Sequence, residues 1–260
     1  MRKTTRVVML ATALLTAVTT WTGARPAAAA EINLLSAGAV RAVVTAVSDT
    51  FAKETGNTVK GTFGTAGVVR QKLTAGEPAD VVIATDVVID ELAKQGAVVA
   101  GTRTDIARAG VGVGVREGAP RPDISTVEAF KQTLLSAKSI VYVDPAQGAT
   151  SGIHFASVLQ RLGIADAVKG KTLLWPGGYA AEAVADGRAE VVVHQISEIL
   201  PVKGVTLVGP LPKDVQKVTI YSAGLAAKAA SPEAGRAFIG YLTSQPVKAK
   251  FAAAGLDYRE

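Results

Sequence analysis

The 260-residue sequence contains no cysteine and only two histidines, His154 and His194. Without cysteine the chain forms no disulfide, offers no thiolate to a metal and has no cysteine nucleophile. The histidines lack the paired HExxH spacing of a zinc site, so no protein-held metal is expected. No GxSxG motif marks a serine nucleophile, and no cofactor is predicted. The sequence therefore shows no motif for metal-dependent or covalent catalysis.

Clustered positive charge is also scarce, although Lys and Arg number 28 against 22 Asp and Glu. Four of the basic residues precede Glu31 and no acidic residue does, which leaves 24 against 22 in residues 31–260. That part of the chain has no run of Lys and Arg and no basic patch interleaved with aromatic residues. A nucleic-acid partner is therefore not expected.

The N-terminal segment has the features of a secretory signal. Three basic residues among the first six precede the uncharged apolar run Val7–Val18, and Ala28–Ala30 offers small residues to a signal peptidase. The apolar run is shorter than the roughly 20 residues that span a bilayer. We predict a signal peptide over residues 1–30, cleavage after Ala30, and a periplasmic protein without a membrane anchor. A retained anchor is the alternative interpretation.

The rest of the sequence alternates apolar runs with amphipathic stretches. Strand and helix patterns follow one another through the first part of the chain, restart near residue 111, and end in two helices. Repeated β-α-β patterns predict mostly parallel sheets with helices on each side. Two such runs indicate an α/β protein with two lobes, and small ligands bind in clefts between lobes. Gly110-x-Gly112-x-Gly114 precedes no helix, so it predicts a glycine-rich strand or hinge rather than a dinucleotide loop.

Three turns rich in small residues lie between a predicted strand and the helix that follows it. Small residues let a ligand approach the backbone, and free N–H groups at a helix start favour an anion. Together the turns predict a divided anion site, whose candidate residues are Ser36, Gly38 and Ala39, then Thr65 and Ala66, and finally Thr150 and Ser151.

Two arginines and one histidine complete the candidate site. Arg41 and Arg70 each follow one of these turns, where a guanidinium can grip a carboxylate or an oxyanion. His194 closes an apolar predicted strand, at a position that faces the cleft in this architecture. His154 lies within a predicted helix and is expected to be structural.

The run Ala75–Ile83, AGEPADVVI, closely resembles the AGxPADxxIS signature of periplasmic molybdate-binding proteins. The resemblance extends through the first strand-turn-helix, the helix over 152–163 and the helix over 245–255. It implies a type II periplasmic-binding-protein fold with two crossover strands, in a monomer that delivers its ligand to an ABC permease. By the same resemblance, residues 31–108 plus 226–260 form lobe I and residues 109–225 form lobe II.

The residues that hold the ligand in that family are not kept here. Ala39 and Ala66 stand where molybdate binders present a serine, and His194 stands where they present a tyrosine. Each missing donor would leave a buried oxyanion oxygen unsatisfied, at a cost of about 1–3 kcal/mol. The arginines fit a larger, carboxylated anion, so a polycarboxylate is favoured over molybdate or tungstate.

The sequence is also similar to the exported aconitate isomerases, which themselves resemble molybdate-binding proteins. An isomerase needs a base that removes a proton next to a carboxylate, and cations that hold the resulting charge. In that interpretation His194 is the base, and Arg41 and Arg70 are the clamps. The interpretation favoured by the sequence is a periplasmic solute-binding protein of an ABC importer, and the isomerase is the alternative.

Overall fold

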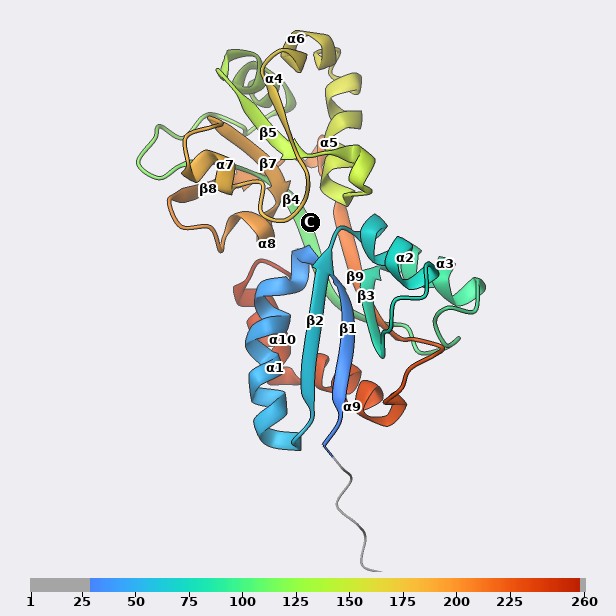
Figure 1. Ribbon diagram of the computed structural model, residues 1–260. Helices are drawn as coiled ribbons and strands as arrows, with labels where there is room; N and C mark the ends of the chain where they lie inside the picture. The colour runs from blue at the N-terminus through green and yellow to red at the C-terminus, as the bar shows by residue number, and fades with distance from the viewer. Residues whose placement is uncertain (1–28, 258–260) are drawn as a thin grey trace, which may run out of the picture.

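The computed structural model describes residues 29–257, and its two lobes lie one above the other in Figure 1. Almost all of the predicted signal peptide therefore falls outside the described residues. Within residues 29–257, no helix combines the length and the apolar character needed to cross a membrane.

The first lobe is built on three parallel strands with β1 in the centre, flanked by β2 and β3. A further strand, β9, pairs antiparallel with β3, and helices pack on both faces of the sheet. The elements of this lobe are β1 (Glu31–Ala37), α1 (Arg41–Thr55), β2 (Thr58–Gly64), α2 (Ala66–Thr74), β3 (Val81–Thr85), α3 (Asp86–Lys94), β9 (Val218–Leu225), α9 (Pro232–Leu242) and α10 (Gln245–Ala253).

Helix α1 shows how the sequence builds this lobe. Its apolar residues Val43, Val44, Val47 and Phe51 recur at helical spacing, and all four are buried against the sheet. The helix ends at Gly56, whose φ of 78° is a left-handed conformation that glycine adopts without steric cost.

The second lobe has a smaller parallel sheet in which β5 lies between β6 and β7. The antiparallel strands β4 and β8 complete it. Its elements are β4 (Thr104–Arg116), α4 (Val127–Ser136), β5 (Ile140–Val143), α5 (Thr150–Arg161), α6 (Ala165–Lys169), β6 (Thr172–Trp175), α7 (Glu182–Ala185), β7 (Val191–Gln195), α8 (Ile196–Ile199) and β8 (Val205–Pro210). Short 3₁₀ turns join some elements of both lobes: η1 (Gly38–Val40) lies between β1 and α1 in the first lobe, η2 (Pro145–Gln147) lies between β5 and α5, and η3 (Lys213–Val215) lies between β8 and β9.

Two long strands, β4 and β9, connect the lobes as the fold class predicts. The first half of β4 pairs antiparallel with β9, and its second half pairs with β7 and β8. In β9, the side chains of Tyr221, Ala223 and Leu225 pack in the core of the first lobe. This packing supports placing the β9 residues with the first lobe, although the sequence boundary at residue 225 assigned them to the second.

Most elements expected from the sequence are present, and the glycine-rich segment at residues 110–114 is part of β4. One strand was missed. Residues 172–175 form β6, a four-residue strand that pairs only with β5.

In the AGEPAD run, Asp80 is buried and accepts hydrogen bonds of 2.7 Å from the backbone N–H groups of Asn33 and Ser231. The carboxylate therefore links β1 to the segment before α9 and lies outside the residues that line the cavity between the lobes.

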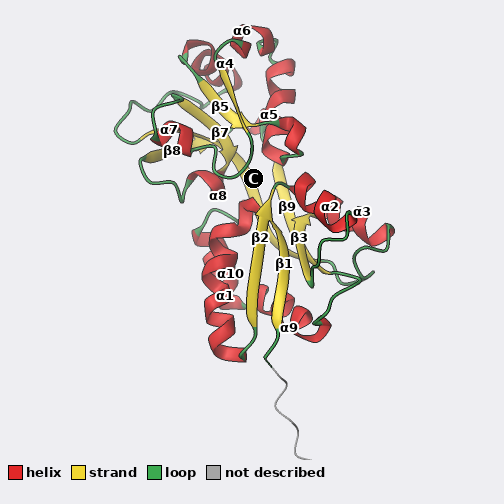
Figure 2. Cartoon of the chain, viewed as in Figure 1, coloured by secondary structure: helices red, strands yellow, loops and turns green. Residues whose placement is uncertain are grey.

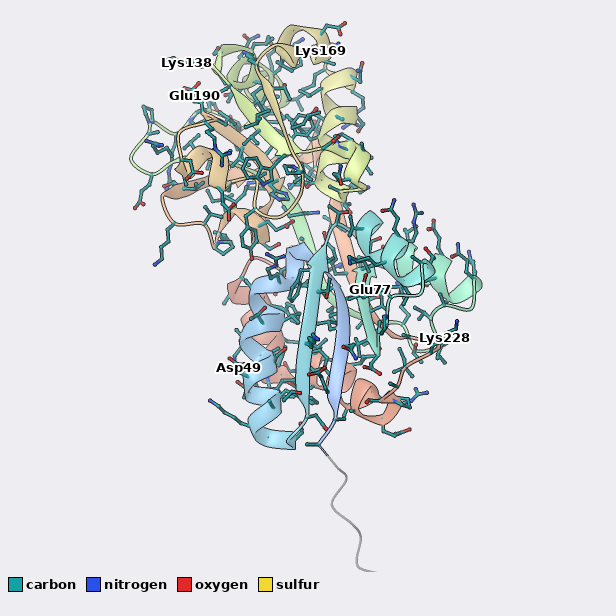
Figure 3. The ribbon with its side chains drawn as sticks, viewed as in Figure 1. Asp49, Glu77, Lys138, Lys169, Glu190 and Lys228 are labelled. Atoms are coloured by element: carbon teal, nitrogen blue, oxygen red, sulfur yellow. The ribbon has the colours of Figure 1, made fainter. Side chains whose placement is uncertain are left out.

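Strand direction determines where a site can form. The parallel strands β1 and β2 end in register at Ala37 and Gly64, so the turns after both strands emerge at the same edge. Figure 2 shows these turns at the junction of the two lobes, facing the second lobe. In Figure 3 the labelled Lys138, Lys169 and Glu190 lie at the end of the second lobe far from this junction.

Candidate functional site

A cavity of about 50 Å³ lies where the two lobes meet. It is bounded by the turns after the parallel strands of both lobes, the position where α/β proteins bind small ligands. The first lobe contributes Ala37, Gly38, Ala39, Arg41, Phe63, Gly64, Thr65, Ala66 and Tyr221. The second lobe contributes Val143, Ala149, Thr150, Ser151, Gly178, His194, Gln195 and Glu198.

Two helices from opposite lobes begin at the cavity. Thr65 caps α2 by accepting a hydrogen bond of 3.1 Å from the backbone N–H of Val68. The first residues of α5, Thr150 and Ser151, line the opposite wall. The N-terminus of a helix carries free N–H groups and a partial positive charge, so the two helices together favour an anion between them.

The lobes also touch directly beside the cavity. The hydroxyl of Thr65 donates a hydrogen bond to the backbone carbonyl of Gln147, and the backbone N–H of Gly67 donates one of 3.2 Å to the carbonyl of Gly148. Both contacts join a residue of the first lobe to η2 or its following turn in the second. The lobes are therefore in direct backbone contact at the rim of the cavity.

Arg41 supplies the cationic side chain of the cavity wall. Its guanidinium carbon lies 5.0 Å from the centre of the Phe63 ring and 5.7 Å from that of Tyr179. These rings belong to opposite lobes and hold the guanidinium by cation–π attraction. The Nε atom of Arg41 is buried and has no hydrogen-bond partner among the described residues. Because a buried donor without a partner is costly, this N–H is suited to a carboxylate ligand.

His194 is buried on the opposite wall, at the end of β7. Its Nδ1 atom lies 3.0 Å from the hydroxyl oxygen of Ser151, and its Nε2 atom lies 3.1 Å from the carbonyl oxygen of Gly178. Only 2% of His194 is exposed. Both ring nitrogens are therefore engaged by the protein itself.

Glu198 lies in α8, four residues after His194, and its Oε2 atom is 3.6 Å from Nε2 of that histidine. Burial raises the pKa of the Glu198 carboxyl, and electrostatic interactions with His194 and Arg41 oppose that shift without cancelling it. A Cβ atom at Gly38 would lie 2.9 Å from Oε1 of Glu198, so the carboxyl packs directly on the turn after β1. The cavity therefore contains a carboxyl that holds its proton unusually firmly.

Gln195 and Tyr221 form a second buried polar pair. The amide nitrogen of Gln195 donates a hydrogen bond of 3.2 Å to the Tyr221 hydroxyl, and Oε1 of Gln195 has no partner among the described residues. Burial, followed by the nearby Glu198 carboxyl, raises the pKa of Tyr221, so the hydroxyl stays protonated.

Eight of the ten residues predicted from the sequence line this cavity: Gly38, Ala39, Arg41, Thr65, Ala66, Thr150, Ser151 and His194. Ser36 does not, because its hydroxyl points away and donates to the carbonyl of Ala37. Arg70 does not either. Its side chain is 48% exposed and pairs with Glu91 of α3 at 3.3 Å, because residue 70 lies more than a turn beyond the start of α2. The part of the chain described by the structure has no cluster of three His, Cys, Asp or Glu side chains suited to a metal.

Sequence reasoning missed Glu198, Gln195 and Tyr221. Glu198 had a usable signal, because it is the one acidic residue in the apolar-rich segment from residue 191 to residue 200 and stands four residues after His194. Residues four apart lie on the same face of a helix, which would have indicated a pair, although the structure places His194 in β7 and Glu198 in α8. Tyr221 gave no signal, because only the pairing of β9 with the rest of the sheet brings it to the cleft.

The two lobes, the two crossover strands and the cleft at the strand ends define a type II periplasmic-binding-protein fold. Residues 32–257 match the model of the bacterial extracellular solute-binding protein family, and the chain belongs to that family. A relative of known activity, the aconitate isomerase of a Pseudomonas species, is 33% identical over 250 residues, which cover 94% of this chain and 93% of the relative.

Solved structures agree with this fold. The periplasmic molybdate-binding protein of Azotobacter vinelandii matches with a TM-score of 0.74 at 20% identity, over 88% of this chain and 100% of that one. The sulfate-binding protein SubI of Mycobacterium tuberculosis matches with a TM-score of 0.70 at 20% identity, over 87% of this chain and 86% of that one. These structures confirm the fold that the resemblance to molybdate-binding proteins predicted.

Proposed function

We propose that the cleft binds a small unsaturated polycarboxylate of the aconitate type and moves a proton within it, so that the protein is an exported isomerase. The observation that carries this proposal is the buried pair of His194 and Glu198 in the wall of an anion-binding cavity. Burial raises the pKa of the Glu198 carboxyl, and a buried carboxyl of this kind in a ligand cavity is a candidate for proton transfer.

The charge distribution favours this function over plain capture of an anion. Arg41 and the starts of α2 and α5 attract a carboxylate, whereas an ionised Glu198 would repel it. Like charges brought together in an interface cost several kcal/mol, so a site that only captured anions would gain nothing from this carboxyl. Proton exchange with the ligand, in contrast, requires a titratable group in the cavity, and the Glu198 carboxyl is such a group.

The proposed reaction is a 1,3-shift of a proton. A base removes a proton from the methylene carbon next to a carboxylate, and the electron pair of that C–H bond spreads through the adjoining double bond and carboxylates. Arg41 and the helix starts stabilise the added negative charge. The proton then returns to the far carbon of the three-carbon unit, which moves the double bond, so no redox partner is needed.

The Pseudomonas relative supports the same proposal, because it is an aconitate isomerase and matches nearly the full length of both chains. The sequence by itself favoured a solute-binding protein over an isomerase. The buried pair, which requires the structure to be seen, reverses that order.

The second candidate function is a periplasmic solute-binding protein that delivers a polycarboxylate to an ABC permease. Its support is membership of the extracellular solute-binding family and a cavity that lies between two lobes. In this candidate the chain is an exported monomer, and His194 and Glu198 only shape the ligand site.

A thermal-shift panel followed by a conversion assay separates these functions. Molybdate, tungstate, sulfate, phosphate, citrate, cis-aconitate and trans-aconitate are compared at equal ionic strength. A ligand at about 100 times its dissociation constant adds roughly 2.7 kcal/mol, which gives a clear shift in Tm. We expect an aconitate to stabilise the protein and to be interconverted with its isomer, as measured by chromatography.

Stabilisation by molybdate or tungstate alone would contradict both candidates. An aconitate that stabilises the protein and stays unconverted would leave the solute-binding protein in place of the isomerase.

A further inference from the structure

We propose that Glu198 is the catalytic residue that exchanges the proton with the substrate, and that His194 is a positioning residue. This inference rests on the proposed isomerase function. It states which residue of the buried pair, His194 or Glu198, transfers the proton. It reverses the assignment made from the sequence, in which His194 was the base.

The hydrogen bonds of His194 leave it no free lone pair. The carbonyl of Gly178 can only accept, so Nε2, at 3.1 Å from it, carries the hydrogen. A neutral imidazole then has its one lone pair on Nδ1, and that atom accepts from the Ser151 hydroxyl at 3.0 Å. A protonated imidazole has no lone pair at all. In either form His194 cannot take a proton from a ligand without losing one of these contacts.

Glu198 is placed differently. One oxygen, Oε2, faces His194, and the other, Oε1, lies against Gly38 in the cavity wall. None of residues 29–257 donates a hydrogen bond to this carboxyl, although only 7% of Glu198 is exposed. A buried carboxyl with a free oxygen next to the anion-binding turn is placed to touch the substrate.

Gly38 is what permits this approach. Any side chain at residue 38 would begin 2.9 Å from Oε1 of Glu198, closer than real Cβ contacts allow. The turn after β1 is in the first lobe and α8 is in the second. The carboxyl is therefore brought to the anion-binding turn only when the two lobes are together.

The surrounding charges suit a group that must both take and return a proton. The groups whose charges act on Glu198 are His194 from β7 and Arg41 from α1, and, besides burial, Glu198 in turn raises the pKa of Tyr221 from β9 and of Tyr179 from the second lobe. Arg41 and His194 favour the carboxylate, whereas burial favours the protonated carboxyl. The carboxylate takes the proton from the methylene carbon as that C–H bond breaks, and it returns the proton to the far carbon as the new C–H bond forms.

The test compares turnover and binding of trans-aconitate in matched variants. Glu198→Gln should lower kcat by about 10²–10⁴-fold, the usual contribution of a general base, and should bind the anion at least as tightly because a competing charge is gone. Glu198→Asp should restore part of kcat. His194→Gln should lower kcat by about tenfold. The activity that remains in this variant should be lost when Glu198→Gln is added. Glu182→Gln, an exposed glutamate outside the cavity, is the control and should match the wild type.

The inference is overturned if Glu198→Gln keeps kcat within threefold of the wild type while His194→Gln loses more than 100-fold. A second measurement needs no substrate. The ¹³C carboxyl signal that is lost in Glu198→Gln should titrate above the ordinary value of 4.5, and a midpoint at or below 4.5 would also overturn it. If the wild type converts no aconitate, the proposed isomerase function is wrong. The ¹³C titration then still tests whether the Glu198 carboxyl is protonated in the cleft.

Discussion

Arg41 and Glu198 bring opposite charges to one small cavity, and they do so from opposite lobes. Arg41 is held between Phe63 and Tyr179, with a buried Nε atom that no described residue satisfies. Glu198 packs on Gly38 and keeps a raised pKa. The cation is suited to holding a carboxylate, and the carboxyl is suited to exchanging a proton with it.

The role of Arg41 can be measured by its replacement. Arg41→Gln removes the one arginine in the cavity wall and keeps a side chain of similar length. Charge-assisted hydrogen bonds contribute about 1.5–3 kcal/mol, so we expect affinity for trans-aconitate to fall by roughly 10–150-fold in calorimetry. Arg70→Gln is the matched control, because Arg70 is exposed and paired with Glu91, and its affinity should stay within about twofold. Equal losses in both variants would contradict the placement of the site.

Glu198 should also affect stability in a pH-dependent way. Burial raises its pKa in the folded protein, so its favourable contribution is complete below the ordinary value of 4.5 and is lost as pH rises through the raised value. Glu198→Gln should therefore have a higher Tm than the wild type at pH 8, and the difference should shrink toward pH 4. Scanning calorimetry from pH 4 to 8 measures this, with Glu182→Gln as the control. A difference that is constant with pH would contradict it.

For single residues, the sequence predicts which residues form the turns of the site, but it does not predict which side chains contact one another. Gly38, Thr65 and Ser151 were predictable, because each follows an apolar strand pattern and opens a helix. Arg70 was misplaced, because sequence distance from a turn does not show which way a helical side chain points. Glu198 was missed, because its importance depends on a contact with Gly38, 160 positions away in the chain.

Among the elements, α2 and α5 do the most to position the site. They begin at the cavity from opposite lobes, and the backbone contact of Gly67 with Gly148 holds their ends together. Both helices were predictable from apolar spacing and a small-residue turn. The short strand β6 was not, because four residues before Pro176-Gly177-Gly178 are too few to distinguish a strand from a turn with a packed Trp.

The close approach of α2 to the second lobe gives an element-scale prediction. A Cβ atom at Gly67 would lie 2.8 Å from the Cα atom of Gly148 and 3.0 Å from the carbonyl oxygen of Gln147. Both are backbone atoms and cannot move aside, so Gly67→Ala should keep the lobes from closing. Alanine is the better helix former by about 1 kcal/mol, so the lobe itself should not lose stability.

We expect Gly67→Ala to keep the Tm of the wild type without ligand and to bind trans-aconitate at least tenfold more weakly. Gly170→Ala is the control, because no atom lies within 4 Å of its new Cβ. Small-angle scattering should show ligand-induced compaction in the control and none in Gly67→Ala. Wild-type affinity in Gly67→Ala would show that the contact is not needed for binding.

For the whole molecule, the two-lobed fold and its crossover strands were predictable from the AGEPAD run and the repeated β-α-β pattern. The ligand was not, because it is set by which side chains meet across the cleft. The cavity of about 50 Å³ has room for only a few water molecules, since each needs about 10–15 Å³ of such space. A polycarboxylate is larger, so we expect the lobes to separate before it binds.

Proton NMR of trans-aconitate incubated with the purified protein is the most direct test of proton transfer in the cleft. We predict that cis-aconitate appears, at a rate that falls by at least 100-fold in Glu198→Gln. An unchanged spectrum, from folded protein whose Tm is raised by trans-aconitate, would contradict proton transfer in the cleft.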